Sequence, residues 1–217
     1  MLTAIIPARG GSKGVKNKNL REIGGKSLVA IAVEKCLQVA DRVYVSTEDK
    51  EIACETIRSG AYWSVRRPSL ATDQVSTWEV IRGTDYLHPI SGDVLLVQCT
   101  APLVTVDDLK RVVDERGNAD MSVLCHEFHG FILNDAGGCL NQLFNPPKRR
   151  QDMSSQYAIA GSAWAFNASY LDRPHIYAGS IKPVLCDGPH CDIDTEDDLE
   201  TAKALHHWRT PVDWKMS

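Results

Sequence analysis

The stretch that decides the fold is Leu2–Leu20, LTAIIPARGGSKGVKNKNL, in which a short apolar run passes directly into a basic, glycine-rich loop. Leu2–Ile6 is apolar enough to predict a strand covered on both faces. The loop Pro7–Asn19 follows at the end of that strand. Because ligands of open α/β sheets bind beyond the carboxyl ends of the strands, this order predicts a first strand and a binding loop together.

The rest of the chain alternates short apolar runs with helical patterns. Strands are predicted at 42–46, 61–65, 93–98 and 182–186, and helices at 27–40, 47–59, 76–87, from 105 onward and at 195–208. Strand–helix alternation of this kind is typical of an α/β fold with helices on both faces of the sheet. The sequence therefore predicts a single domain over residues 1–217, built as a three-layer, doubly wound, mostly parallel sheet.

The pattern changes between Met121 and Phe166, where short strand signals alternate with turns such as Asp135–Gly138. Four strands are predicted there, at 122–125, 131–134, 139–144 and 162–166. We interpret residues 126–160, approximately, as a small β-rich insertion in the domain.

Composition excludes several classes of protein. The formal net charge is −4 in 217 residues, which argues against nucleic-acid binding, since that function is associated with basic domains. No apolar stretch approaches the roughly 20 residues of a membrane-spanning helix. The seven cysteines are odd in number and include no CxxC motif, which favours reduced thiols. We therefore expect a cytoplasmic protein that contacts neither nucleic acid nor membrane.

The loop after the first strand has the chemistry of a triphosphate site. Arg9, Lys13, Lys16 and Lys18 fall within ten residues, together with three glycines. Glycine lets backbone N–H groups approach an anion, arginine presents a planar fork and lysine a point charge. The alternative is a solvated basic loop. Neither a Walker A motif nor a GxGxxG fingerprint is present, so the loop is a phosphate cradle of another kind.

Two aspartates near the end of the chain are candidate metal ligands. Asp192 and Asp194 are two positions apart, so in an extended segment both side chains point to one side. Mg²⁺ takes one or two carboxylates plus phosphate oxygens and water. The alternative is an exposed acidic loop that leads into the helix cap and first turn at Thr195–Asp198. Cysteine and histidine pairs at 125–129 and 186–191 favour buried thiols and surface imidazoles over zinc.

These motifs together resemble the CMP-sialic acid synthetases, or N-acylneuraminate cytidylyltransferases. The N-terminal stretch from Ile5 to Leu20 carries most of the resemblance. Four further segments match the family's patterns: Arg67–Asp73, Val97–Leu103, Arg149–Asp152 and Asp192–Leu199. The resemblance implies the fold of the nucleotide-diphospho-sugar transferases. It also implies transfer of CMP from CTP to a nonulosonic, sialic-acid-like sugar acid, and a homodimer formed through the β-rich insertion.

The resemblance assigns a role to each matching position. Catalysis would rest on Arg9 and Lys18, and Mg²⁺ on Asp192 and Asp194. The nucleotide would be bound by the phosphate-lining Gly10, Gly11 and Ser12 and by the cytosine- and ribose-binding Asn19, Arg67, Ser76 and Thr77. The sugar acid would be bound by Gln98, Thr100, Arg150 and Gln151.

The departures from the family pattern fall on the acceptor side. Val104 stands where the family often has arginine, and Ala158 and Ala160 replace an arginine and an asparagine. We therefore expect a nonulosonic acid without preferring N-acetylneuraminate over legionaminate or pseudaminate. Two alternatives stay open: a glycosyltransferase that uses Asp192–Asp194 as a DxD motif, and a nucleotide-binding homologue with an altered acceptor pocket.

Overall fold

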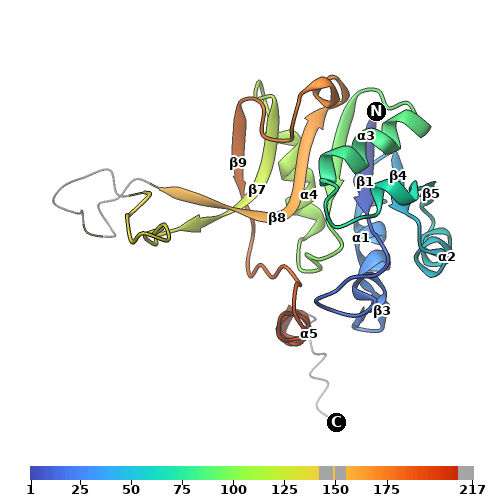
Figure 1. The fold of residues 1–217 in the computed structure, drawn as a ribbon, viewed down its shortest axis with the longest axis horizontal. Helices are drawn as coiled ribbons and strands as arrows, with labels where there is room; N and C mark the ends of the chain where they lie inside the picture. The colour runs from blue at the N-terminus through green and yellow to red at the C-terminus, as the bar shows by residue number, and fades with distance from the viewer. Residues whose placement is uncertain (142–148, 150–154, 210–217) are drawn as a thin grey trace, which may run out of the picture.

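The computed structural model describes residues 1–141, 149 and 155–209. A seven-stranded sheet lies at its centre (Figure 1). Its strands are β1 (Leu2–Pro7), β4 (Arg42–Thr47), β5 (Tyr62–Val65), β6 (Asp93–Val97), β7 (Met121–Phe128), β8 (Gln156–Asn167) and β9 (Ile181–Leu185). A separate hairpin consists of β2 (Glu22–Ile23) and β3 (Lys26–Ser27).

The strands follow the order β5-β4-β1-β6-β8-β7-β9. Strands β5, β4, β1 and β6 run parallel, β8 is antiparallel to both β6 and β7, and β9 is parallel to β7. The mostly parallel sheet predicted from the sequence is therefore confirmed. Because the first four strands run in one direction, the loops that leave them meet at a single edge.

Helices cover both faces of this sheet. They are α1 (Leu28–Cys36), α2 (Lys50–Arg58), α3 (Thr77–Leu87), α4 (Val106–Asp114) and α5 (Glu196–Arg209). Successive side chains of β1 point to opposite faces of the sheet, as in any β-strand. Ala4 and Ile6 pack in a core with α1 and α4, whereas Ile5 packs with Trp78 and Ile81 of α3. The three-layer arrangement is thus confirmed. Within the described residues, no helix is both long and apolar enough to span a membrane.

Side-chain caps set where the helices begin. Ser27 accepts a hydrogen bond from the amide of Ala30 at the start of α1. Asp49, rather than the expected Thr47, caps α2 by accepting from the amides of Glu51 and Ile52. Thr47 ends β4, and its hydroxyl accepts from the Asp49 amide at 3.1 Å. These caps satisfy the first helical N–H groups and so fix the loops at the sheet edge.

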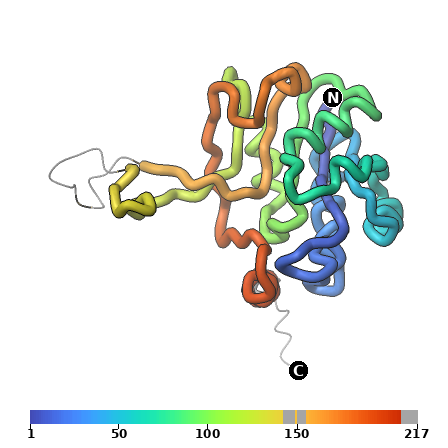
Figure 2. The backbone as a smooth tube through the Cα atoms, viewed as in Figure 1, coloured from blue at the N-terminus to red at the C-terminus, as the bar shows by residue number. Residues whose placement is uncertain are grey.

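Strands β7 and β8 continue beyond the sheet as a two-stranded arm (Figures 1 and 2). We define the arm as residues 125–141 and 155–160. A register shift between Val123 and Cys125 marks where it leaves the sheet. The two inner strands predicted at 131–134 and 139–144 are wrong over the described residues, where only an isolated bridge joins Leu133 to Cys139. A short hairpin with no third strand to pack against is marginal, which explains the difference.

Candidate active site

A cavity of about 350 Å³ opens at the carboxyl edge of β1, beside the loop that the sequence identified. Its walls come from four segments that are far apart in the chain. They contribute the polar residues Arg9, Ser12, Lys13, Lys18, Asn19, Arg66, Thr72, Asp73, Thr77, Gln98, Thr100 and Asp194. Eight of the residues predicted from the sequence are in this set: Arg9, Ser12, Lys18, Asn19, Thr77, Gln98, Thr100 and Asp194.

A carboxylate holds the two basic side chains at the mouth of this cavity. Asp73 forms ion pairs of 2.5 Å with both Arg9 and Lys13. The hydrogen bonds from Lys13 and Arg9 hold the pKa of the Asp73 carboxyl below its usual range. Arginine and lysine placed in this way are a binding site for phosphate oxygens. Asp73 therefore occupies the position that an anionic ligand would take between them.

A second carboxylate engages the backbone of the same loop. The amide of Gly10, which we expected to face a phosphate, donates to Glu48 Oε1 at 2.8 Å. Gly10 and Gly11 line an adjoining open cavity together with Glu48 and Asp49. A Cβ on Gly10 would lie 2.6 Å from Asp49 Oδ2, so only glycine fits there without movement. The Gly10 amide is thus oriented by Glu48, an acidic residue that follows β4.

Lys18 links the basic loop near the N-terminus to the segment that contains Ile193 and Asp194. Its ammonium group donates to the carbonyl of Ile193 at 2.8 Å and to Asp194 Oδ1 at 3.1 Å. Asn19 is buried, and its side-chain amide donates to the Arg9 carbonyl at 2.9 Å, which holds the loop in place. The basic loop and the Asp192–Asp194 segment are therefore parts of a single site.

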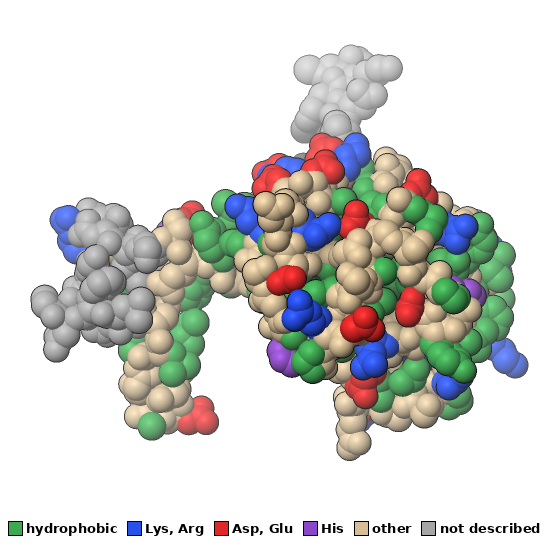
Figure 3. Space-filling view, turned by 90° about the horizontal axis from the view of Figure 1, so that it is seen from above, with side chains coloured by type: hydrophobic (Ala, Val, Ile, Leu, Met, Phe, Trp, Pro, Cys, Tyr) green, Lys and Arg blue, Asp and Glu red, His purple; other side chains and the backbone are tan. Residues whose placement is uncertain are grey.

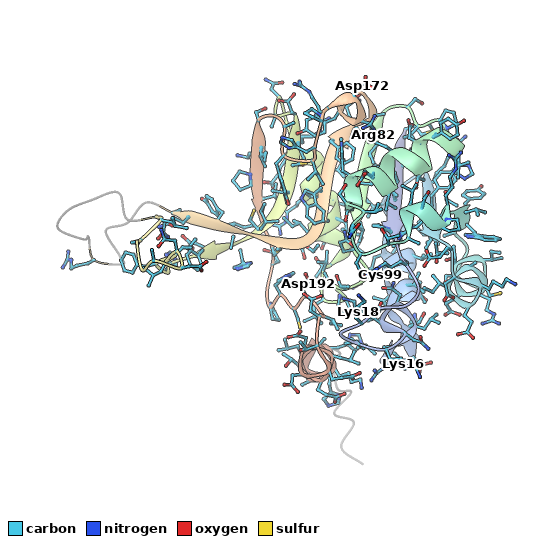
Figure 4. All side chains as sticks on the ribbon, in the orientation of Figure 1. Lys16, Lys18, Arg82, Cys99, Asp172 and Asp192 are labelled. Carbon is cyan, nitrogen blue, oxygen red and sulfur yellow. The ribbon has the colours of Figure 1, made fainter. Side chains whose placement is uncertain are left out.

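The carboxylate of Asp192 has an oxygen that is free to bind a ligand. Its Oδ1 is buried and has no hydrogen-bond partner among the described residues. A Cβ on Gly161 of β8 would lie 2.9 Å from Oδ2 of Asp192, so the glycine leaves room for this carboxylate. Figure 4 shows Asp192 near Lys18 and Cys99 at the carboxyl edge of the sheet. The described residues contain no group of three or more acidic, histidine or cysteine side chains suited to a metal. A pair of carboxylates nevertheless fits Mg²⁺ when phosphate oxygens complete its coordination.

The structure separates two neighbouring arginines that the sequence could not distinguish. Arg66 lines the cavity, is 5% exposed and donates from Nη2 to the Ser46 carbonyl at 2.7 Å. Burial lowers its pKa, although Glu48 opposes this shift. Arg67, the predicted nucleotide ligand, does not line this cavity. It lies over the Tyr86 ring, with its Cζ 5.0 Å from the ring centroid, and lines a smaller cavity that Arg66 also borders. Sequence reasoning therefore missed Arg66, whose only signal was its position beside Arg67.

A second cavity, of about 540 Å³, adjoins the first and shares Thr77 and Gln98 with it. Ser76 lines this second cavity and caps α3 by accepting from the Glu79 amide. Thr100 lies in the first cavity, and its carbonyl accepts from the Ile193 amide at 2.9 Å. Arg150 and Gln151, the remaining predicted sugar ligands, lie outside the described residues. The arrangement provides two compartments that meet at Thr77 and Gln98.

Comparison with known proteins identifies the family. The family model described as cytidylyltransferase matches residues 3–154. The chain belongs to this cytidylyltransferase family. It is 31% identical to pseudaminic acid cytidylyltransferase of Campylobacter jejuni, over 93% of this chain and 94% of that protein. It is 28% identical to N-acylneuraminate cytidylyltransferase A of Danio rerio, over 92% of this chain and 49% of that protein.

Solved structures agree with the fold. The cytidylyltransferase chain superposes on CMP:2-keto-3-deoxy-manno-octonic acid synthetase complexed with CTP with a TM-score of 0.74, at 18% identity. The match covers 95% of this chain and 98% of that one. The resemblance predicted from the sequence and the predicted fold class are both confirmed.

Proposed function

We propose that this cytidylyltransferase transfers CMP from CTP to a nonulosonic acid and releases pyrophosphate. The observation that carries the proposal is a pair of adjoining cavities at the carboxyl edge of the sheet. One is lined by basic side chains, and the other, of about 540 Å³, is large enough for a sugar acid. Its relatives of similar length and sequence are named for CMP transfer to such acids. The hydroxyl oxygen of the acid would attack the α-phosphorus in line as the bond to the β-phosphate breaks.

In this proposal the first cavity holds the nucleotide. Arg9 and Lys18 stabilise charge on the phosphates as pyrophosphate leaves, and Lys13 adds a third cation. Gly10, Gly11 and Ser12 lie beside the phosphates. The Gly10 amide, which donates to Glu48 in the free protein, would then donate to a phosphate oxygen instead. The base and ribose lie toward Asn19, Ser76 and Thr77, with Arg66 proposed in addition to Arg67.

We propose that Asp192 and Asp194 hold Mg²⁺ against the phosphates. When bound there, the ion would act as a Lewis acid on the phosphate oxygens and fix their orientation. The unpartnered Oδ1 of Asp192 supports this assignment, because a buried carboxylate oxygen without a hydrogen bond is otherwise costly.

The second cavity takes the sugar acid, with its reacting hydroxyl at the wall shared by Thr77 and Gln98. Gln98 and Thr100 contact the reacting end of the acid. Arg150 and Gln151 remain proposed ligands of the acceptor. The assignment is tested by measuring pyrophosphate release with CTP, Mg²⁺ and a panel of nonulosonic and ulosonic acids. Release with one acid names the substrate, whereas CTP binding without release from any acid would support the nucleotide-binding homologue.

Replacement of Asp73 is expected to tighten nucleotide binding. In the free enzyme its carboxylate forms ion pairs with Arg9 and Lys13, and its negative charge would repel a triphosphate. Asp73→Asn should lower the dissociation constant of CTP by about three- to tenfold, in the range expected for exposed charge pairs. Isothermal titration calorimetry measures this constant, with Asp172→Asn as a control on a distant surface. Weaker binding would show instead that Asp73 holds the two cations in their binding positions.

We propose that the arm joins two copies of the chain. Phe131, Ile132, Leu133 and Leu140 are between 47% and 63% exposed on it, and Figure 3 shows hydrophobic side chains along the protruding arm. Clustered apolar surface of this kind marks an interaction site. A second copy of the same arm would cover it with matching apolar surface.

Charge placed on the arm is expected to separate the copies. The double variant Leu133→Asp/Leu140→Asp should weaken self-association by about 100-fold or more, as loss of central interface anchors does. Sedimentation velocity at micromolar concentration measures the effect. Ile57→Asp, at an equally exposed position of α2, is the matched control. A wild-type protein that sediments as a monomer would contradict the proposal.

We also propose that the enzyme works in the reducing cytoplasm. All seven cysteines are free thiols in the structure. Burial raises the pKa of the Cys99 thiol, beside the nucleotide cavity, to about 12, so this thiol stays protonated and unreactive.

A further inference from the structure

The small cavity that Arg66 and Arg67 border is lined by buried polar side chains from two neighbouring strands. Ser46 of β4 and Ser64 of β5 are partners in the strand register, so their side chains lie side by side on one face of the sheet. Arg66 follows Ser64 by two positions, and α3 covers this face (Figure 1). Ser46, Ser64 and Arg66 are each at most 5% exposed. We call this space, of about 60 Å³, the serine cavity.

These buried groups have hydrogen-bond donors that the protein itself does not use. The Ser64 hydroxyl has no hydrogen-bond partner among the described residues. Arg66 donates from Nε to Ser46 Oγ at 3.4 Å and from Nη2 to the Ser46 carbonyl at 2.7 Å, which leaves Nη1 without a hydrogen bond to a described residue. Ser46 Oγ accepts in this contact, so its own proton is left for another acceptor. Because a buried donor without an acceptor is costly, these groups favour a bound acceptor.

The walls of the serine cavity carry positive charge and no negative charge. Arg66 lines it from the buried side and Arg67 from the exposed rim, whereas no described aspartate or glutamate does. Arg66 Nε is 3.9 Å from Glu48 Oε2, while Oε1 of Glu48 accepts from the Gly10 amide. A buried charge is ordinarily paired and hydrogen-bonded with its counterion. An anion in the serine cavity would complete the pairing of Arg66.

Size and donor geometry select the kind of anion. One water molecule needs about 10–15 Å³ of such a cavity, so the serine cavity has room for about four to six water-sized atoms. Inorganic phosphate has one phosphorus and four oxygens, and its tetrahedral oxygens can accept from Arg66, Ser64 and Ser46 in different directions. A carboxylate has its two oxygens in a single plane, and a nucleotide is too large for the space.

We infer that the serine cavity is a second anion site, which binds inorganic phosphate. It is separate from the nucleotide cavity, although Arg66, Leu70 and Val80 line both. On the basis of the proposed function, Arg66 couples the two sites. Phosphate in the serine cavity engages the guanidinium and brings negative charge close to the triphosphate, so it weakens CTP binding without displacing the nucleotide.

Backbone amide resonances in a nuclear magnetic resonance titration can report phosphate binding at each site separately. Val65 and Gly83 line the serine cavity, whereas Gly11 lies in the basic loop and does not line it. Inorganic phosphate, added at constant ionic strength, should shift the Val65 and Gly83 resonances of the wild type along a saturable curve. Ser64→Ala should raise the dissociation constant from these two resonances by about tenfold, as loss of a hydrogen bond to a charged group does, without changing the titration at Gly11.

Thr84→Val is the matched control within the same cavity. The Thr84 hydroxyl lines the cavity but already donates to the Val80 carbonyl at 3.1 Å, so it has no proton left for an anion. The variant keeps the shape of the side chain and should leave the phosphate constant unchanged. A titration that shifts Gly11 alone would show that the serine cavity holds only water, and would overturn the site. An unchanged constant in Ser64→Ala would overturn it as well.

The coupling to the nucleotide is measured by calorimetric titration of CTP at rising phosphate concentrations. Over the range that saturates the Val65 shift, the dissociation constant of CTP should rise by about five- to tenfold and then level off, as coupling between two sites requires. A rise in proportion to phosphate, unchanged in Ser64→Ala, would mean competition in the nucleotide cavity and would overturn the coupling. A protein that shows the phosphate dependence but releases pyrophosphate with no acid would retain the anion site and contradict the proposed function.

Discussion

Asp194→Asn is expected to lower kcat for pyrophosphate release by about 1,000-fold, the scale on which loss of a charge-stabilising group acts in a preorganised site. Asp194 lines the nucleotide cavity, yet its side chain is 76% exposed, so the loss would come from the site rather than from unfolding. Asparagine has the same size but lacks the charge that holds Mg²⁺. The rate is measured with saturating CTP and the acid identified in the panel.

A second readout separates metal binding from other effects of this substitution. Calorimetric titration with CTP should show that added Mg²⁺ tightens binding to the wild type and no longer does so in the variant. Asp197→Asn, three residues further along in the first turn of α5, is the matched control. If the variant kept full activity and its Mg²⁺ response, Asp194 would be only the ion-pair partner of Lys18.

The basic loop was the most predictable part of this site. Its glycines and cations follow an apolar strand, and the fold rules place such a loop at the binding edge of the sheet. The sequence could not show that Asp73 and Glu48 hold the loop's own donors, because these contacts depend on how separate strands align. Nor could it distinguish Arg66 from Arg67, because a shift of one residue at the end of a strand reverses the face on which a side chain lies.

The second cavity shows why the acceptor side was less predictable. It is assembled from α3, β6, β8 and the segment after β8, and of its lining only Ser76, Thr77 and Gln98 were predicted as site residues from the sequence. Trp164 gave only the signal of an apolar strand residue, and Arg82 that of an exposed helical position. Both line one cavity, in which the indole N–H of Trp164 is buried without a hydrogen-bond partner among the described residues, and this juxtaposition is a property of the packed fold alone.

Lys18→Met is expected to lower kcat by about 100- to 1,000-fold while changing the KM for CTP much less, because the charge is needed most as pyrophosphate leaves. Methionine has an unbranched apolar stem of similar length but carries no charge. The Lys18 side chain is only 16% exposed, so its ammonium group acts in a partly desolvated setting where charge is screened weakly by water. Steady-state kinetics of pyrophosphate release measure both constants.

Lys16→Met provides the matched control, because Lys16 lies two residues away in the same loop but is exposed and does not line the cavity (Figure 4). It should reduce the rate by less than about threefold, as a solvated charge outside the site would. Equal losses in the two variants would mean that the loop acts through its overall charge. A loss confined to Lys18→Met would instead locate the effect at the ammonium group that bridges the loop to Ile193 and Asp194. That bridge would then be the contact through which the two ends of the chain form one catalytic site.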